Sequence, residues 1–177
     1  MFSVEFNQLY TLHKDMVFNL SLQYVQNVED AEEITQDVFL SIHRNLDKFR
    51  QEADYSTWIY RIAINKSLDF IKRKKRKKRF AFLTSLFYED GNAIKHDHSD
   101  FSHPGVALEQ KESVASLFKL INELPEKQKT VLILLKIDGR SQKEAALIMN
   151  LTEKAIESLL QRAKKNLDIK LAKTKDL

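Results

Sequence analysis

The stretch YSTWIYRIAINKSLDFIKRKKRKKR, Tyr55 to Arg79, decides the fold that we predict for this chain. Apolar and aromatic side chains recur at helical spacing through its first two thirds, and eight consecutive basic residues, Lys72–Arg79, follow. A hydroxyl side chain at a helix start can accept a hydrogen bond from a free N–H group, so we expect Ser56 or Thr57 to cap the helix. The segment is interpreted as one helix with a cationic tail.

The charge of the chain is segregated. The whole chain carries +4 and Lys72–Arg79 alone carries +8, so the remaining residues sum to −4. A segregated basic block favours a polyanionic partner, which is either nucleic acid or an acidic membrane surface. A solvated lysine-rich tail remains the alternative.

The composition points to helices. A chain of 177 residues can form one domain or two small ones, and 43% hydrophobic residues is typical of a folded protein. Three glycines and two prolines are too few for the many tight turns of an all-β protein. Cysteine is absent, which excludes disulfides and thiolate zinc sites. We find neither a signal-peptide pattern nor a membrane-spanning apolar run, and we expect a cytoplasmic protein without stable membrane insertion.

One face of the helix over 55–79 has an unusual set of side chains. At about 100° per residue, the five that share a stripe about 80° wide are Trp58, Arg61, Asn65, Asp69 and Lys72. Trp can stack on unpaired bases, Asn can bond a base edge, and Arg and Lys can neutralise phosphate. The stripe therefore suggests a nucleic-acid surface. The alternative is that Trp58 belongs to the core beside an exposed polar edge.

Two further helices are expected before this one. The first spans about Glu5 to Gln26, and the second starts near Asp30, whose spacing to Glu33 suits a helix start, and runs to about Phe49. Five carboxylates lie in the first turns of the second helix, which makes it either a solvated face or a docking surface for a basic partner. Residues 49–55 are expected to form a loop.

Residues 80–107 are predicted to form an irregular linker, because no helical period persists and Gly91, Pro104 and Gly105 interrupt it. It contains His96, His98 and His103, whose spacing matches no rigid metal site, so we expect no metal. Helical periodicity resumes at Leu108, and a further apolar helix is expected from Pro125 to Ile137, ended by Asp138-Gly139.

A helix-turn-helix is predicted at the C-terminal end. Ser141 and Glu144 have the spacing of a capping box, Thr152 can cap a last helix, and the small Ala145 and Ala146 allow the helices to cross closely. Its exposed candidates for DNA contact are Glu153, Lys154, Glu157, Ser158, Gln161, Arg162 and Lys165.

No pattern in the sequence argues for catalysis. It has no clustered glycines for a phosphate loop, no cysteine nucleophile and no His-Glu-x-x-His pattern. We therefore expect a protein that is not an enzyme and that needs no cofactor.

Three segments in order resemble a known family. They are DAEEITQDVFL from Asp30, FRQEADYSTWIYRIAINKSLDFIKR from Phe49, and LPEKQKTVLILLKIDGRSQKEAALIMNLTEKAIESLLQRAKKNL from Leu124. Together they resemble bacterial RNA polymerase sigma factors of the sigma-70 family, and in particular the small extracytoplasmic-function (ECF) group. The resemblance implies an all-α fold of two small helical domains joined by an irregular linker. We assign sigma domain 2 to residues 1–79, the linker to 80–107 and sigma domain 4, with the helix-turn-helix, to 108–177.

The resemblance also implies site residues in three groups. Contacts with the β′ clamp helices of core RNA polymerase are expected from Asp30, Glu33, Gln36, Asp37 and Phe39. Contacts with the minus-ten promoter element, where one strand melts and a base flips out, are expected from Arg50, Tyr55, Ser56, Thr57, Trp58, Arg61, Asn65, Lys72 and Arg73. Contacts with the minus-thirty-five element are expected from Ser141, Thr152, Lys154, Glu157, Ser158, Gln161, Arg162 and Lys165.

Residues around Leu124 to Leu135 resemble the part that docks on the polymerase β flap, and the family implies an anti-sigma factor as a candidate partner. The sequence departs from the family at Glu157 and Leu159, where basic residues are frequent, and at Gln142-Lys143, which replaces an aromatic-acid pair. Two other functions remain open. One is a helix-turn-helix regulator that acts without polymerase, and the other is a helical adaptor that binds acidic partners through Lys72–Arg79.

Overall fold

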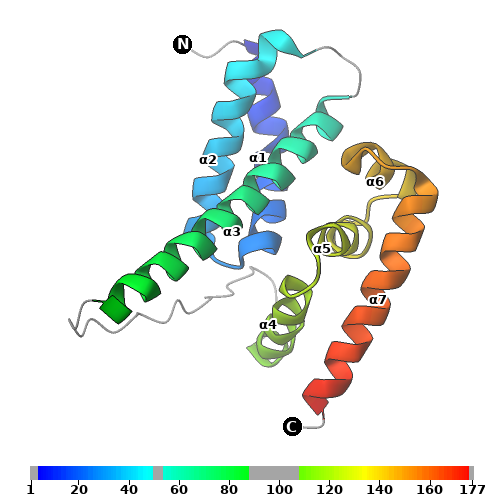
Figure 1. Cartoon of the computed structure of the whole chain (residues 1–177). Coiled ribbons are helices and arrows are strands. Elements are labelled where there is room, and N and C mark those ends of the chain that lie inside the picture. Colours follow the sequence, from blue (N-terminus) through cyan, green and yellow to red (C-terminus); the bar gives the residue numbers. More distant parts are fainter. Residues whose placement is uncertain (1–3, 50–53, 88–107, 176–177) are drawn as a thin grey trace.

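The computed structural model of this chain describes residues 4–49, 54–87 and 108–175, and none of these residues forms a strand. The first unit contains α1 (Val4–Val25), α2 (Val28–Asn45), a 3-10 turn at Leu46–Lys48, and α3 (Tyr55–Phe87). The second contains α4 (Leu108–Asn122), α5 (Glu126–Leu132), a π-helical turn at Ile133–Ile137, α6 (Gln142–Met149) and α7 (Glu153–Lys175). The predicted all-α fold of two helical units is confirmed (Figure 1).

The first unit is a bundle of α1, α2 and α3 around an apolar core. The core positions of each helix recur at three- and four-residue spacing, which places them on one face. Its fully buried side chains include Val17, Leu20, Tyr24, Ile34, Val38, Ile42, Ile59 and Tyr60.

The starts of α2 and α3 differ from the prediction. The side chain of Asn27 caps α2 by accepting a hydrogen bond from the Asp30 N–H at 2.8 Å. Asp54 caps α3 by accepting from the Thr57 N–H at 2.6 Å, so Ser56 and Thr57 lie inside the helix and do not cap it. Asn and Asp are among the strongest helix caps. Asn27 lies three residues before the predicted start at Asp30, and Asp54 lies two residues before Ser56.

Helix α3 extends past the basic run. It has 33 residues and reaches Phe87, so the first residues assigned to the linker are helical. Lys and Arg are good helix formers, and no Gly or Pro occurs between Tyr55 and Phe87 to end the helix. The rest of the predicted linker, with His96, His98 and His103, lies outside the described residues.

The second unit contains the predicted helix-turn-helix. Ser141 Oγ accepts from the Glu144 N–H at 3.2 Å, and the Ser141 N–H donates to the Glu144 carboxylate at 2.8 Å, which confirms the capping box. Asn150 turns the chain with a left-handed φ of 52°, and Thr152 Oγ1 accepts from the Ala155 N–H at 3.2 Å. The core includes Val131, Ile133, Leu134, Ala145, Ala146, Ile148, Ile156 and Ala163.

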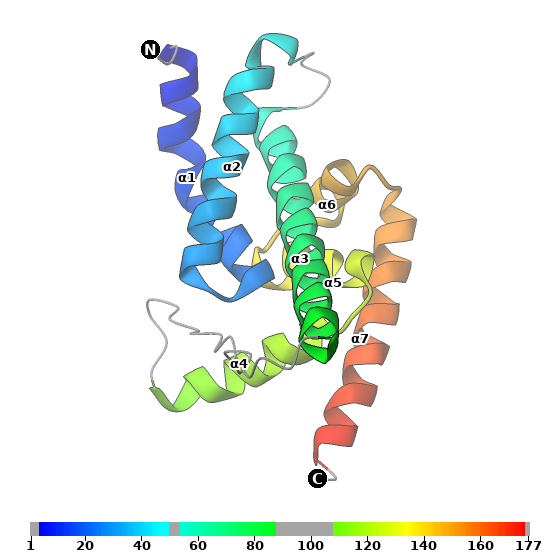
Figure 2. The ribbon, with the colours of Figure 1, turned by 60° about the vertical axis from the view of Figure 1, so that its left-hand side comes forward.

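The two units pack against each other. Helix α3 lies between the α1–α2 pair and helices α5 and α6, as both ribbon views show (Figures 1 and 2). Lys129 Nζ of α5 donates to the Tyr24 carbonyl oxygen of α1 at 2.9 Å, and the Tyr60 hydroxyl of α3 donates to the Asp138 carboxylate. The described helices include none with the length and apolar character of a membrane span.

Candidate nucleic-acid and polymerase interface

The first turns of α3 carry an aromatic cluster. The Trp58 ring lies 4.9 Å from the Phe49 ring and 6.4 Å from the Tyr55 ring, measured between centroids. Trp58 packs against the core, as the alternative interpretation expects, and it remains partly exposed; its contact with nucleic acid stays a prediction. Ser56 is also partly exposed and Thr57 is buried, whereas Arg50 lies outside the described residues.

Arg61 and Asn65 follow on the same face of α3. Arg61 Nη2 donates to the Leu147 carbonyl oxygen at 2.7 Å, and Nε donates to the Ile148 carbonyl oxygen at 3.3 Å. Asn65 is exposed and lines a groove of about 570 Å³ between α3 and the helices α5 and α6. These two members of the predicted stripe therefore face the second unit of the chain.

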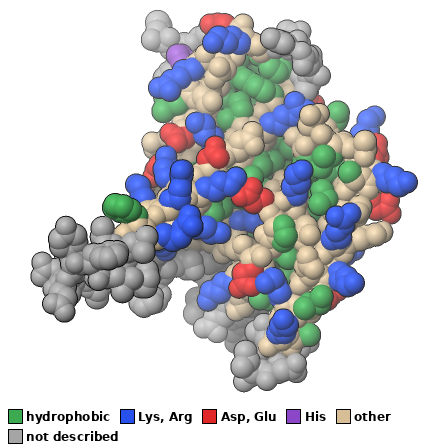
Figure 3. Space-filling view, viewed as in Figure 1, with side chains coloured by type: hydrophobic (Ala, Val, Ile, Leu, Met, Phe, Trp, Pro, Cys, Tyr) green, Lys and Arg blue, Asp and Glu red, His purple; other side chains and the backbone are tan. Residues whose placement is uncertain are grey.

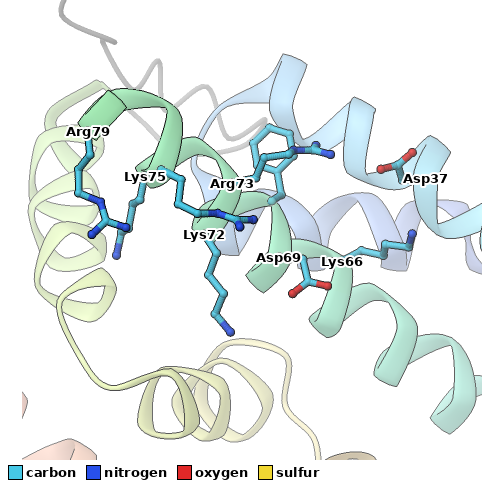
Figure 4. A pocket seen from close by; sticks show the side chains of 9 residues that line it. Asp37, Lys66, Asp69, Lys72, Arg73, Lys75 and Arg79 are labelled. Atoms are coloured by element: carbon cyan, nitrogen blue, oxygen red, sulfur yellow. The ribbon is translucent and has the colours of Figure 1, made fainter. Parts of the chain in front are cut away.

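A basic cleft continues along α3 toward its C-terminal end (Figure 4). Its volume is about 670 Å³, and it is lined by Asp37, Lys66, Asp69, Phe70, Lys72, Arg73, Lys75, Arg76 and Arg79. In the space-filling view, Lys and Arg side chains gather along this part of the surface (Figure 3). The cations share one side of a single helix, so the cleft can attract a phosphate backbone without reading its sequence.

Carboxylates pair with several cations of the basic run. Lys74 Nζ lies 2.6 Å from the Asp30 carboxylate, and Arg73 Nη2 lies 2.9 Å from that of Glu33. Arg73 and Glu33 are both about half exposed, so solvent screens that pair strongly. These two acids of α2 thus have partners on α3 in this conformation.

The remaining residues of the predicted polymerase-binding group differ in exposure. Gln36 is exposed and Asp37 is partly exposed at the rim of the basic cleft (Figure 4). Phe39 is only 4% exposed, because its ring packs edge-on against Phe6 and Tyr10. A buried ring offers no surface to a partner, so Phe39 supports the bundle core instead. In the sequence, the position of Phe39 next to Val38 in the apolar row of this helix already indicated a place in the core.

Helix α7 displays the predicted recognition face. Among its candidate residues Ser158 is partly exposed, and the exposed ones are Glu153, Lys154, Glu157, Gln161, Arg162 and Lys165. Arg162 Nη2 donates to Ser158 Oγ at 2.9 Å, which holds the guanidinium along the helix surface. Ile156 and Ala163 lie on the opposite face and are buried. Ser141 and Thr152 serve as helix caps and are exposed.

The two units meet at a polar contact zone that was not predicted from the sequence. Lys129 is 4% exposed, and burial, with a smaller effect from Lys75, lowers its pKa to about 7. Burial, followed by the hydrogen bond to Asp138, raises the pKa of Tyr60. In the sequence, Lys129 stands directly before the apolar run that follows Thr130. A lysine at the edge of such a run was the one indication that a polar group would be buried here.

A helix-turn-helix in an all-α chain is an arrangement typical of DNA-binding transcription proteins. The family model Sigma-70 region 2 matches residues 9–77, and the model Sigma-70, region 4 matches residues 115–167. Together the two matches cover more than half of the chain. The chain belongs to the sigma-70 family and is a sigma factor of the ECF group, which initiates transcription with core RNA polymerase at promoter DNA.

Individual relatives agree with this assignment. The RNA polymerase sigma-H factor of Pseudomonas aeruginosa is 27% identical over 165 residues, covering 92% of this chain and 84% of the relative. The ECF RNA polymerase sigma-E factor of Escherichia coli K12 is 28% identical over 169 residues, covering 94% of this chain and 86% of the relative. Sigma factors are generally non-enzymatic DNA-binding regulators, and neither alternative function is favoured by these matches.

Two solved structures share the fold. CnrH in complex with the cytosolic domain of CnrY has a TM-score of 0.64 and 22% identity, and the match covers 94% of this chain and 87% of that one. The sigma factor RpoE in complex with the anti-sigma factor NepR, from Bartonella quintana, has a TM-score of 0.65 and 20% identity. That match covers 96% of this chain and 98% of the other.

Proposed function

We propose that this sigma factor divides promoter reading between α7, which enters the major groove of the minus-thirty-five element, and α3, which captures the melting minus-ten element. The observation that carries the proposal is that each matched sigma region contains one helix with a polar reading face. Residues 1–79 and 108–177 then correspond to sigma domains 2 and 4.

Helix α7 is suited to a groove. Lys154 and Arg162 can neutralise phosphate or bond a guanine edge, and Gln161 can make paired hydrogen bonds to adenine. All three are exposed on one helix whose other face is anchored in the core. The two caps at Ser141 and Thr152 fix the starts of α6 and α7, so the reading helix is held at a defined angle.

Helix α3 is suited to an unpaired strand. Trp58 with Phe49 and Tyr55 can stack on bases, Asn65 can bond a base edge, and Arg61 can hold the backbone. Unstacking a base costs a few kcal/mol, and stacking contacts of about 1–3 kcal/mol per base can offset that cost. The cations of Lys72–Arg79 add attraction to the adjoining duplex, which makes binding salt-dependent.

Polymerase docking is assigned to α2 and to residues 124–135. Gln36 and Asp37, with Asp30 and Glu33 beside them, present a polar and acidic face to the β′ clamp helices. Within residues 124–135, Pro125, Glu126 and Lys127 are exposed and Leu135 is partly exposed, whereas Val131, Ile133 and Leu134 are buried, so contact with the β flap is assigned to the two ends of this segment.

The polymerase supplies the chemistry, and this chain itself performs no catalysis. It acts where polymerase and genome meet, which is the cytoplasm. An anti-sigma factor is proposed as a further partner, supported by the fold neighbour that was solved with one.

Run-off transcription with core RNA polymerase and fragments of the source genome tests the proposal. The expected result is a set of transcripts that appear only when the chain is added. A conventional regulator would instead bind duplex promoters tightly without polymerase and yield no transcripts. A helical adaptor would bind acidic proteins or anionic vesicles, and that binding would survive Arg162→Ala.

A further inference from the structure

A lysine-lined cavity lies where α1 and the C-terminal half of α3 meet the end of α4 and the start of α5. Its volume is about 300 Å³, which is at the lower end of the range typical for small-molecule pockets. We propose that this cavity binds the diphosphate group of a small free molecule. None of the promoter contacts proposed above uses this cavity, so the site stands or falls independently of them.

Lys129 supplies a buried positive charge to the cavity. Its side chain is only 4% exposed, and Nζ donates to the Tyr24 carbonyl oxygen at 2.9 Å and to the side-chain oxygen of Asn122. Both acceptors are neutral, and no carboxylate of the described residues pairs with this ammonium. A buried charge without a counter-charge is unfavourable. An anion in the cavity would supply the missing negative charge.

The rest of the charged wall also favours an anion. Lys74, Lys75 and Lys78 of α3 line the same cavity, and its one carboxylate belongs to Asp30. That carboxylate lies 2.6 Å from Lys74 Nζ. With four lysines and one aspartate, the charges of the wall sum to +3 when all are ionised. A diphosphate has several charged oxygens, so it can accept charge-assisted hydrogen bonds from more than one ammonium group at once.

The cavity lies on a different side of α3 from the basic cleft assigned to the DNA backbone. Lys74 and Lys78 are each two residues from Arg76, so at about 100° per residue each lies about 160° from it around the helix. Arg76 lines the basic cleft, whereas Lys74 and Lys78 line the lysine cavity. Lys75 borders both. The basic run thus presents cations on two sides, and the side with Lys129 leaves room for a small molecule and not for a duplex.

Binding of an anion should be coupled to protonation of Lys129. Burial, with a smaller effect from Lys75, lowers the pKa of Lys129 to about 7. A bound anion favours the charged ammonium and raises that pKa, so binding takes up protons and the affinity decreases as pH rises above 7. The other charged or titratable groups around the site come from four elements: Tyr24 of α1, Asp30 of α2, the three lysines of α3, and Glu126 of α5.

Calorimetric titration of the full-length chain with sodium pyrophosphate tests the site. Pyrophosphate should bind saturably, and Lys129→Met should weaken the affinity about tenfold at pH 6.5, as expected for the loss of one charge-assisted bond. The ratio of the two affinities should shrink several-fold by pH 8.5, because Lys129 of the free native chain has then lost its proton. Titration of pyrophosphate and of the other groups occurs with both proteins and cancels in the ratio. A ratio that is constant with pH would show that the substitution acts through packing, and it would overturn the proposal.

Two neighbouring surface lysines provide a matched pair of variants. Lys78→Gln removes a cation of the cavity, and Lys77→Gln removes the same charge from the adjacent position, which lines neither cavity. Both side chains are exposed, so neither variant disturbs the core. Lys78→Gln should weaken pyrophosphate binding several-fold, and Lys77→Gln should leave it unchanged. Equal losses in the two variants would indicate diffuse attraction to the basic run and would overturn the site.

A DNA arm distinguishes a small phosphate compound from the phosphates of nucleic acid. Lys129→Met should bind a random 20-mer duplex as tightly as the native chain, because the duplex is assigned to the other side of α3. Failure of pyrophosphate to saturate the native chain at about 1 mM, together with weaker duplex binding by Lys129→Met, would overturn the proposal and assign these lysines to DNA. A failed run-off assay with saturable pyrophosphate binding would reject the promoter-reading mechanism and leave the phosphate site standing.

Discussion

The Tyr24 hydroxyl donates a 2.7 Å hydrogen bond to Thr130 Oγ1, which joins α1 to α5 across 106 residues of sequence. Next to Thr130, Lys129 donates to the main-chain carbonyl of the same tyrosine, and its ammonium lies 4.8 Å from the centre of the Tyr24 ring. One residue of α1 thus holds two consecutive residues of α5, and one of them titrates near neutral pH.

The stability of the folded chain should rise with pH because of Lys129. Its pKa is lowered from 10.5 to about 7 by burial and secondarily by Lys75 of α3, so above pH 7 the folded chain binds fewer protons than the unfolded chain. The resulting stability is fully present above pH 10.5 and is lost as pH falls through 7. Tyr24 of α1 and Glu126 of α5 are the other titratable groups near this site, and the pKa of Tyr24 is raised by burial.

Urea unfolding between pH 7 and 9.5 measures this effect. The free energy of unfolding should increase more steeply with pH in the native chain than in Lys129→Met, which retains the length of the side chain but cannot titrate. Parallel curves for the two proteins would show that Lys129 does not control the pH dependence.

Replacing Asn65 should impair promoter opening alone. Asn65 is exposed on α3, so Asn65→Ala leaves the bundle core intact and removes one base-edge contact, with an expected loss of about 1–3 kcal/mol. Permanganate reactivity of promoter thymines should fall, and co-purification with core polymerase should not change. Asn19→Ala, at an exposed position of α1, is the control. Equal permanganate reactivity for the two variants contradicts the assigned role.

Reversing the charge at Asp37 should weaken holoenzyme assembly. Asp37→Lys replaces a carboxylate at the rim of the basic cleft, so a basic polymerase surface would meet repulsion there. The affinity for core polymerase should decrease and should depend less on salt. Asp15→Lys changes the charge equally on an exposed position of α1. The same affinity for both variants would rule out α2 as the docking face.

Removing the capping hydroxyl at Ser141 should destabilise the helix-turn-helix. Ser141→Ala leaves the first N–H groups of α6 without their side-chain acceptor, which costs about 1 kcal/mol. Hydrogen bonds from Ser141, followed by Arg140, lower the pKa of Glu144 to about 2, and the variant should raise that pKa. Thermal unfolding and a carboxyl NMR titration measure the two effects, with exposed Ser116→Ala as the control. An unshifted Glu144 pKa would show that the Ser141 hydroxyl does not affect it, because the Ser141 backbone N–H still donates to the carboxylate in the variant.

Local patterns predicted the helices and the capping box, because both depend on residues close in sequence. Periodicity located the core positions of α2 and α3, and Ser141 with Glu144 predicted the start of α6. Phe39 was assigned to a surface because family resemblance carries a role and not a side-chain direction. The residue packs on Phe6, 33 positions away, and that contact exists only in the folded bundle.

The contacts between the two units could not be predicted from the sequence. Tyr and Thr are as common on protein surfaces as in contacts, so nothing in the sequence marks Tyr24 and Thr130 as partners. Their hydrogen bond depends on how the second unit docks on the first. Helical spacing predicted that Arg61 shares a face of α3 with Asn65. It could not predict the partners of Arg61, which are main-chain carbonyls whose positions depend on where α6 ends. Main-chain acceptors have no signature in the sequence.

Because α3 is one unbroken helix, it fixes the distance between the side chains along it, as a ruler does. Its 33 residues span about 50 Å, and the 15 steps from Arg61 to Arg76 cover about 22 Å, at a rise of about 1.5 Å per residue. That distance corresponds to between about six and seven base pairs of duplex at about 3.4 Å each. The separation between the strand that α3 is proposed to capture and the duplex backbone that its basic run is proposed to attract is therefore set by the number of residues between them. Inserting one residue between 65 and 72 would lengthen the ruler by only about 1.5 Å but would turn its cationic end by about 100°.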